Sequence, residues 1–314
     1  MSRLFFLFVS RVYDYQKKTS DFVRQNSTLM DFDKNSWCIL NPIERSIKGK
    51  IEKIGVPLKD WDIKIYRGVL TGCNEAFIID GATKDALIAQ DPKSAEIIRP
   101  ILRGRDIKRY SYEFADKWLI ATFPSRHYNI DDYPAVKNYL LSFGKEKLEQ
   151  SGKKDIGGIK GNNARKKTNN KWFETQDTIA YWDDFSKQKL VWTPVNSEYR
   201  FTILPPDIFF NNSLFMITGK SIKYLCAILN SNLFIFYLNL ILGGENYTYG
   251  SGNVFASIPI KLSLPEEETK IDVLVESALS GNLSAQQSIN QYIYKIFQLS
   301  DDEQLYIENS SSVK

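Results

Sequence analysis

The sequence predicts an α+β fold in which a mixed sheet lies between a helical N-terminal segment and a helical C-terminal part. Short apolar or alternating segments, bounded by glycine and proline, occur mainly in the middle of the chain, whereas helical periodicity dominates before and after them. Of the 314 residues, 43% are hydrophobic and 25% are charged, which is the composition of a globular protein with a real core. This composition excludes global disorder.

Residues 1–55 are expected to be mainly helical. Apolar residues recur there at spacings that place them on one helix face, and Gly55 and Pro57 are expected to end the last helix. The residues that carry this pattern are Phe22, Val23, Met30, Ile43, Ile47, Ile51 and Ile54.

The middle of the chain, residues 56–264, is expected to form a sheet-containing domain. Asp62–Arg67 alternates polar and apolar residues, as a half-buried strand does. Gly68 and Thr71-Gly72 then predict a turn before the next strand. Further strands are expected at 76–79, 118–123, 178–182, 189–193, 200–204 and 214–217, and helices at 83–90 and 134–150.

The chain is expected to be helical again from Ser221, with 265–314 as C-terminal helices that pack on the sheet domain. Leu225–Leu242 is an uncharged stretch of 18 residues, long enough to span a membrane. Asn230-Ser231-Asn232 interrupts it, and Ser and Asn are preferred helix N-caps. The sequence therefore favours two buried helices that meet at an N-cap, and no membrane partner. A glycine-rich aromatic loop is expected at 243–252.

The scarce residues exclude several classes of site. A single histidine, His127, excludes a metal site built from several histidines within one chain. The three cysteines are far apart and form no CxxC pair, which excludes a zinc ribbon and argues against a disulfide scaffold. The apolar run Leu4–Val9 is short, and Arg11 follows it without a cleavage site, so no secretion signal is expected. We expect a cytoplasmic protein.

The positive charge of the chain is concentrated in one segment. The formal net charge is only +4, yet residues 145–171 contain nine basic residues against three acidic ones and are rich in Gly and Asn. We expect a mobile basic loop that neutralises DNA phosphates, with Asn and Arg able to read base edges. Its candidate DNA-binding residues are Lys153, Lys154, Lys160, Asn162, Asn163, Arg165, Lys166, Lys167 and Lys171.

A second basic cluster precedes the expected strand at 118–123. Its candidate DNA-binding residues are Arg105, Lys108 and Arg109. Either cluster alone would be read as a solvated face, but aromatic residues at 172–173 and 181–182 favour nucleic-acid binding. We assign Trp182 and Trp192 themselves to the core.

No catalytic constellation is expected. The chain lacks the Asn/Asp-Pro-Pro-aromatic signature with which amino-methyltransferases hold a flipped base. Neither a metal site nor a cofactor site is assigned to this chain. One alternative is a metal-dependent nuclease built from Asp207, Glu268 and Lys270.

Six segments resemble, in family order, the TaqI-like specificity domain. This domain is the target-recognition region of N6-adenine DNA methyltransferases and of type IIG restriction–modification enzymes. The resemblance extends from about residue 40 to 308, and its segments are Ile65–Ile79, Ile98–Tyr110, Lys171–Glu174, Lys189–Thr193, Ala227–Phe234 and Tyr292–Glu303.

The resemblance implies a target-recognition domain that recognises double-stranded DNA in a sequence-specific way. Its partner would be a methyltransferase or endonuclease domain or subunit that uses S-adenosylmethionine, and Mg²⁺ for cleavage. Because the catalytic half is missing, we expect a fragment, a truncated product or a separate specificity subunit. The alternative is a protein–protein docking subunit that contacts DNA only in a complex.

Within the family pattern, Gly68–Asn74 and Arg103–Tyr110 are framework motifs. Pairing of Arg103 and Arg105 with carboxylates inside the domain is therefore an alternative to DNA contact. The variable part between Trp118 and Trp172 is where recognition is expected to differ between targets, which favours the basic loop as the contact surface.

Overall fold

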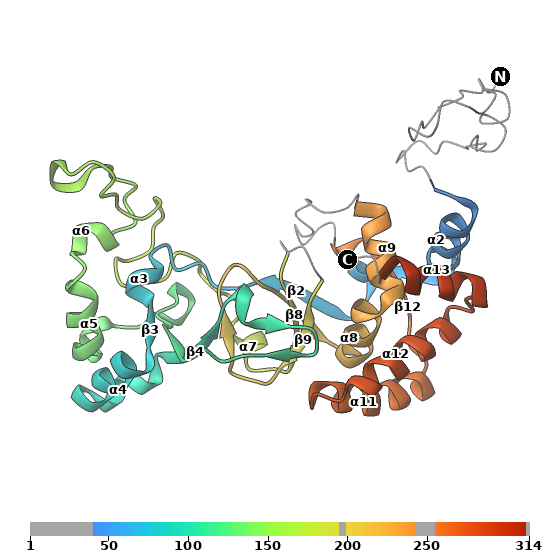
Figure 1. The fold of residues 1–314 in the computed structure, drawn as a ribbon. Helices are drawn as coiled ribbons and strands as arrows, with labels where there is room; N and C mark the ends of the chain where they lie inside the picture. The colour runs from blue at the N-terminus through green and yellow to red at the C-terminus, as the bar shows by residue number, and fades with distance from the viewer. Residues whose placement is uncertain (1–39, 195–198, 243–254, 312–314) are drawn as a thin grey trace, which may run out of the picture.

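The computed structural model describes residues 40–194, 199–242 and 255–311. The molecule is elongated, with a small helical and sheet layer at one end, a helical bundle at the other and a sheet between them (Figure 1). The helices expected before residue 40 and the whole glycine-rich aromatic loop lie outside the described residues. The α+β class with a helical C-terminal part is confirmed.

The first described helix, α2 (Pro42–Ile54), forms because both of its ends are specified locally. Asn41 accepts a hydrogen bond from the Glu44 backbone at 3.0 Å, and Glu44 accepts one in return, which is a capping box. Ile47 and Ile51 are fully buried, as their spacing predicts. After the helix, β1 (Gly55–Pro57) pairs antiparallel with β12 (Pro259–Lys261).

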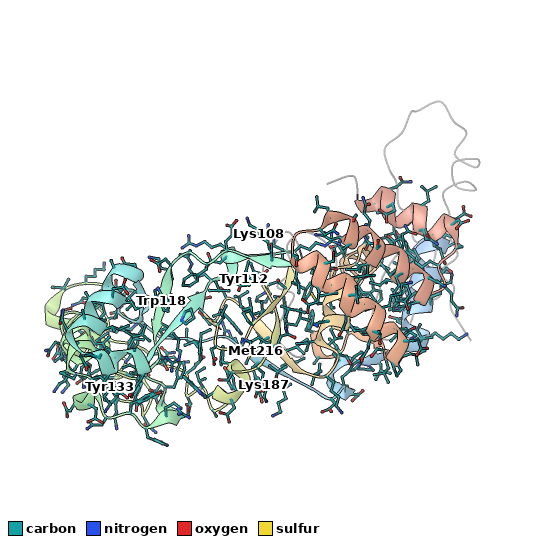
Figure 2. The ribbon with its side chains drawn as sticks, turned by 90° about the horizontal axis from the view of Figure 1, so that it is seen from below. Lys108, Tyr112, Trp118, Tyr133, Lys187 and Met216 are labelled. Carbon is teal, nitrogen blue, oxygen red and sulfur yellow. The ribbon has the colours of Figure 1, made fainter. Side chains whose placement is uncertain are left out.

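A four-stranded antiparallel sheet forms the centre of the molecule. Its order is β2 (Ile63–Arg67), β11 (Phe215–Gly219), β8 (Lys189–Trp192) and β9 (Phe201–Leu204). Alternate residues enter two different cores, since Leu190 belongs to the core of the helical bundle and Val191 to the core at the other end. Both faces are therefore buried, and the sheet connects the two ends. Met216 lies in this central region (Figure 2).

The second sheet lies toward the end of the molecule that carries the basic loop. Its order is β10 (Phe209–Phe210), β4 (Ile98–Leu102), β7 (Lys117–Ile120) and β3 (Ile78–Asp80), and it is mixed because β10 runs parallel to β4. A small hairpin, β5 (Ile107–Lys108) with β6 (Ser111–Tyr112), follows β4. The short helices of this end are α3 (Asn74–Phe77), α4 (Gly81–Gln90), α5 (Pro134–Leu141) and α6 (Lys145–Leu148).

Three expected elements differ from the structure. The strand expected at 76–79 begins with the helical turn α3, and only Ile78 onward is extended. The helix expected at 134–150 is divided into α5 and α6, because Gly144 has φ +87°. The strand expected at 178–182 is absent: Ile179 has φ +51°, which a strand does not allow, and the helix α7 (Trp182–Phe185) follows.

The C-terminal helices form the bundle at the other end of the molecule (Figure 1). The expected break between two helices is confirmed: α8 (Ile222–Asn230) and α9 (Asn232–Leu242) meet at Ser231, whose hydroxyl accepts a hydrogen bond from Phe234 at 3.2 Å. Three more helices follow, α11 (Pro265–Leu279), α12 (Leu283–Ile296) and α13 (Asp301–Ser311).

The membrane question concerns only α8 and α9. Within the described residues, no single helix has the length and apolarity needed to cross a membrane. The two helices reach that length and apolarity only together, and they are bent by 70° relative to each other. All but one of the α8 side chains are buried in the core of the bundle.

One buried lysine fixes the end of the central sheet. Lys189 is fully buried, and its ammonium donates to the backbone carbonyls of Phe185 (2.7 Å), Lys187 (3.0 Å) and Pro205 (2.9 Å). Burial lowers the pKa of Lys189 to about 8. The side chain thus joins the segment at 185–187 to the turn at Pro205.

The Lys189→Met variant is expected to lose about 1–3 kcal/mol of unfolding free energy, because the carbonyls of Lys187 and Pro205 lose the ammonium donor and that of Phe185 keeps only the Asp207 N–H. Urea denaturation measures this loss, with the exposed Lys187→Met as the control. Since the unfolded chain holds the Lys189 proton more tightly than the folded chain, wild-type stability also gains a contribution as pH rises from about 8 toward 10.5. The variant should lack this contribution; equal pH profiles would contradict the assignment.

Candidate nucleic-acid interface

The basic loop, residues 145–171, is an ordered hairpin that projects from one end of the molecule near α6 (Figure 1). Backbone hydrogen bonds join its two arms, including Gly152 N–H to Arg165 O at 2.9 Å and Ala164 N–H to Lys153 O at 2.9 Å. The side chain of Ile156 is buried at its centre. The two arms therefore satisfy each other's backbone groups, and the mobility expected for this loop stays a prediction.

The two predicted asparagines hold the tip of the basic loop. Asn163 accepts from the Asp155 backbone at 3.1 Å, and Asn162 donates to the Ile156 carbonyl at 3.3 Å. Asp155 in turn accepts from the Gly161 backbone at 2.7 Å. These groups stabilise the turn, so reading of bases by Asn162 and Asn163 stays a prediction that would require these bonds to rearrange.

Arg165, predicted to bind DNA, is instead a buried framework residue. Only 4% of it is exposed, and its guanidinium lies 5.0 Å from the centre of the Phe77 ring. Burial lowers its pKa to about 10, so it remains charged at neutral pH. Its donors are occupied by four backbone carbonyls, those of Leu148 (2.7 Å), Thr71 (2.9 Å), Glu174 (2.7 Å) and Trp172 (2.6 Å).

The contact with Thr71 joins the basic loop to the framework motif at Gly68–Asn74. Gly72 has φ +76°, and a Cβ atom on it would lie 2.5 Å from Gln176 Oε1 and 3.0 Å from Arg165 Cδ. Only glycine fits there. An open cavity of about 390 Å³ lies beside this junction, lined by Gly72–Glu75, Lys147 and Asn163–Arg165.

The lysines of the basic loop face solvent, as predicted. Lys153 pairs with Glu146 at 3.5 Å, and the Lys171 ammonium lies 5.6 Å from the centre of the Phe173 ring. Four further candidate lysines form no ion pair with any residue that the structure describes, and all are exposed: Lys154, Lys160, Lys166 and Lys167. They are the groups that can neutralise phosphates without first losing an internal partner.

The second basic cluster is mostly engaged within the protein. Arg103 binds Asp106 through two hydrogen bonds of 2.9 and 2.8 Å, as the framework alternative predicts. Arg109 donates to the Asn230 carbonyl at 2.6 Å, and its Nε is buried, so its assignment to DNA stays a prediction that would require this contact to rearrange. Lys108 is exposed but pairs with Glu113, and Arg105 is exposed.

The two basic clusters do not form one surface. Lys108 lies in the middle of the elongated molecule (Figure 2), whereas the basic loop lies at one end near α6 (Figure 1). The β5–β6 hairpin that carries Lys108 contacts β9. Among the described residues, the basic loop brings four exposed lysines without ion pairs onto one hairpin.

Sequence analysis missed two arginines that flank Trp182. The guanidinium of Arg126 lies 5.1 Å from the centre of the Trp182 ring, and that of Arg99 lies 5.9 Å from it. Arg126 is exposed. Trp182 packs against Phe123 and Phe209, which confirms its place beside the core. The two arginines are far apart in sequence and belong to no charged run, so no local pattern predicts the pair.

The residues of the alternative nuclease site have separate partners. Asp207 accepts from Ser186 at 2.9 Å, Glu268 binds the hydroxyls of Ser221 and Ser263, and the Lys270 ammonium lies 4.2 Å from the centre of the Tyr292 ring. Over the ranges that the structure describes, no three His, Cys, Asp or Glu side chains are grouped as metal ligands.

Comparisons with known proteins show which solved structures the chain resembles. Two solved structures are similar at low identity: the type IIL restriction–modification enzyme MmeI, determined in complex with DNA (12% identity, 87% of this chain, TM-score 0.46), and the type IIG restriction endonuclease BpuSI (11%, 82%, 0.45). The chain covers 35% and 33% of their lengths. No curated protein matches the sequence.

The family assignment rests on a sequence match. A family model described as the TaqI-like C-terminal specificity domain matches residues 99–260, just over half of the chain. The match begins at Arg99, so it includes the basic loop, the central strands β8, β9 and β11 and the helices α8 and α9, while the segments Ile65–Ile79 and Tyr292–Glu303 lie outside it. The resemblance stated from the sequence is confirmed, and the chain belongs to the TaqI-like C-terminal specificity domain family.

Proposed function

We propose that this chain recognises a target sequence in double-stranded DNA through the basic loop, as the specificity element of a restriction–modification system. One observation supports this most directly: four exposed lysines, which form no ion pair with a described residue, stand on a hairpin that Arg165 fixes to the framework. A rigid cationic surface can follow the phosphates of a duplex without a large loss of entropy on binding.

The charge distribution along the molecule also supports binding of the duplex at the end that carries the basic loop. The last 50 residues contain nine acidic and three basic residues, the reverse of the basic loop. They form the helices α11–α13 at the opposite end of the molecule (Figure 1). A DNA polyanion is therefore attracted to the loop end and repelled from the bundle end.

The catalytic partner belongs to the same proposal. We assign methylation to an adenine-specific DNA methyltransferase domain or subunit, in the manner of type IIG enzymes, acting in the cytoplasm. S-adenosylmethionine, and Mg²⁺ for cleavage, would be bound by that part. The role of this chain's own residues is to hold and orient the duplex.

Selection from a random duplex library tests the proposal. The full chain, immobilised and washed at moderate salt, should enrich one short sequence over successive rounds, because base contacts add to the phosphate contacts. The Lys154, Lys160, Lys166 and Lys167 alanine variant serves as the control and should enrich none. Retention of DNA by the wild type without any sequence enrichment would contradict specific recognition. Enrichment only after a methyltransferase subunit is added would favour the docking-subunit alternative.

A further inference from the structure

The tip of the basic loop carries an exposed isoleucine. Ile159 is 63% exposed, although it lies between Gly158 and Lys160 at the outer end of the hairpin. Single exposed apolar residues are common on protein surfaces and by themselves indicate nothing. The surroundings of Ile159 distinguish it from the other exposed apolar residues that the structure describes.

The backbone around Ile159 is fixed. Ile159 N–H donates to the Ile156 carbonyl at 3.3 Å, and the Ile159 carbonyl accepts from Asn162 N–H at 3.1 Å. Gly158 N–H donates to Asp155 O at 3.0 Å. An isoleucine on such a turn is presented in a defined place, and its branched side chain has few rotamers to lose.

The residues beside Ile159 leave it clear of neighbours. Gly157, Gly158 and Gly161 all have positive φ, and a Cβ atom on any of them would meet nothing within 4 Å. The tip is therefore narrow, and Ile159 is its apolar projection. The one acidic side chain of the tip, Asp155, is turned to the Gly161 backbone.

The other strongly exposed apolar residues have a different setting. Val273, Leu283 and Leu305 are 69%, 74% and 60% exposed, but they lie on α11, α12 and α13, in the acidic part of the chain. Ile159 is the one that stands among lysines, with Lys160 beside it and Lys154 on the same loop. A polyanion with an apolar interior fits this combination of charges and shape.

We propose that Ile159 is a wedge that inserts between two stacked base pairs when the lysines of the basic loop bind the duplex. This inference rests on the proposed DNA-binding function and adds a mechanism to it. Isoleucine is one of the apolar side chains that partly unstack a base step, and unstacking a step unwinds and kinks the duplex.

The unwinding of a closed plasmid tests the wedge without knowledge of the target sequence. A relaxed, covalently closed plasmid is incubated with the full chain and topoisomerase I, and its linking number is read on a gel after the protein is removed. The wild type should lower the linking number in proportion to the amount bound. Ile159→Ala should still retard the plasmid, with affinity lower by about tenfold or less, but should lose the shift.

Two further variants control the experiment. Ile159→Leu should keep the shift, since leucine is also a wedge residue, and Leu283→Ala should behave as wild type because it lies on the bundle. An undiminished shift in Ile159→Ala, or plasmid binding by the wild type with no shift, would overturn the wedge while leaving DNA binding intact. If the wild type fails to retard the plasmid at low salt, the proposed function fails as well.

Discussion

Replacing Arg165 by methionine is expected to lower the free energy of unfolding by about 3–5 kcal/mol. Methionine fills similar space but donates no hydrogen bond, so the carbonyls of Thr71, Leu148 and Trp172 would lose this donor, and that of Glu174 would keep only the Gln150 amide. Three of them belong to segments distant from one another, at Thr71, Leu148 and Trp172. Urea denaturation followed by circular dichroism measures the loss.

Two further variants separate the planar guanidinium from its charge. Arg165→Lys keeps the charge, but one ammonium with three donors does not match four carbonyls arranged around a planar fork, so most of the loss should remain. Lys166→Met changes the neighbouring residue, which is exposed, and should leave stability within about 0.5 kcal/mol. An Arg165→Met variant as stable as the wild type would show that the loop is held without this residue.

The contrast between arginine and lysine is also where sequence analysis failed most clearly. Composition treats both as positive charges, and on that basis the sequence assigns Arg105, Arg109 and Arg165 to the same function as the candidate lysines. The structure turns Arg103, Arg109 and Arg165 inward and leaves the lysines outside. Arginine has five donors in a rigid fork and suits several carbonyls at once. Its partners lie as far away as Thr71, 94 residues earlier, so no local pattern reveals them.

The ordered loop is a second case. Glycine and asparagine correctly predicted irregular backbone at 145–171, because such residues adopt turns. They did not predict that Gly152 pairs with Arg165, and Ala164 with Lys153, across the two arms. Nor did they predict that Ile156 is buried beneath the tip. Composition indicates which backbone conformations a segment can adopt. Whether the segment is ordered depends on contacts between residues that meet only in the folded chain.

The secondary structure could be predicted more completely from the sequence than the contacts could. Where the apolar pattern was regular, as in α2, β2 and β8, the expected elements are confirmed. The break at Ser231 was also predicted from its capping residues. The prediction of a strand at 178–182 was wrong because its aromatic side chains pack against the core from a turn. Tyr181 lies two residues after Ile179, whose backbone is left-handed, and its ring centre is 4.2 Å from that of Tyr66.

Replacing Lys154, Lys160, Lys166 and Lys167 by alanine is expected to weaken duplex binding by about a hundredfold or more near 0.1 M salt. Each lysine is exposed and has no ion pair among the described residues, so each can approach a phosphate without breaking an internal contact. For the same reason the variant should fold normally. Fluorescence anisotropy with a labelled 30-bp duplex selected by the wild-type chain measures the change.

A matched variant controls for the loss of four charges. Lys53, Lys59, Lys64 and Lys295 are also exposed, but they lie outside the basic loop. Replacing them by alanine changes the net charge by the same amount and should weaken binding by less than about fivefold, through the general field alone. Equal losses in the two variants would mean that net charge, and not the loop, carries binding.

The salt dependence of this binding tests the central claim, that the basic loop contacts the DNA phosphates, most directly. The logarithm of the association constant is measured against the logarithm of salt concentration for the wild type and for the four-lysine loop variant. If each lysine neutralises one phosphate, the slope of the wild type should be steeper by about 3.6. Identical slopes for the two proteins, with the affinity retained, would place the DNA elsewhere on the molecule and contradict the account.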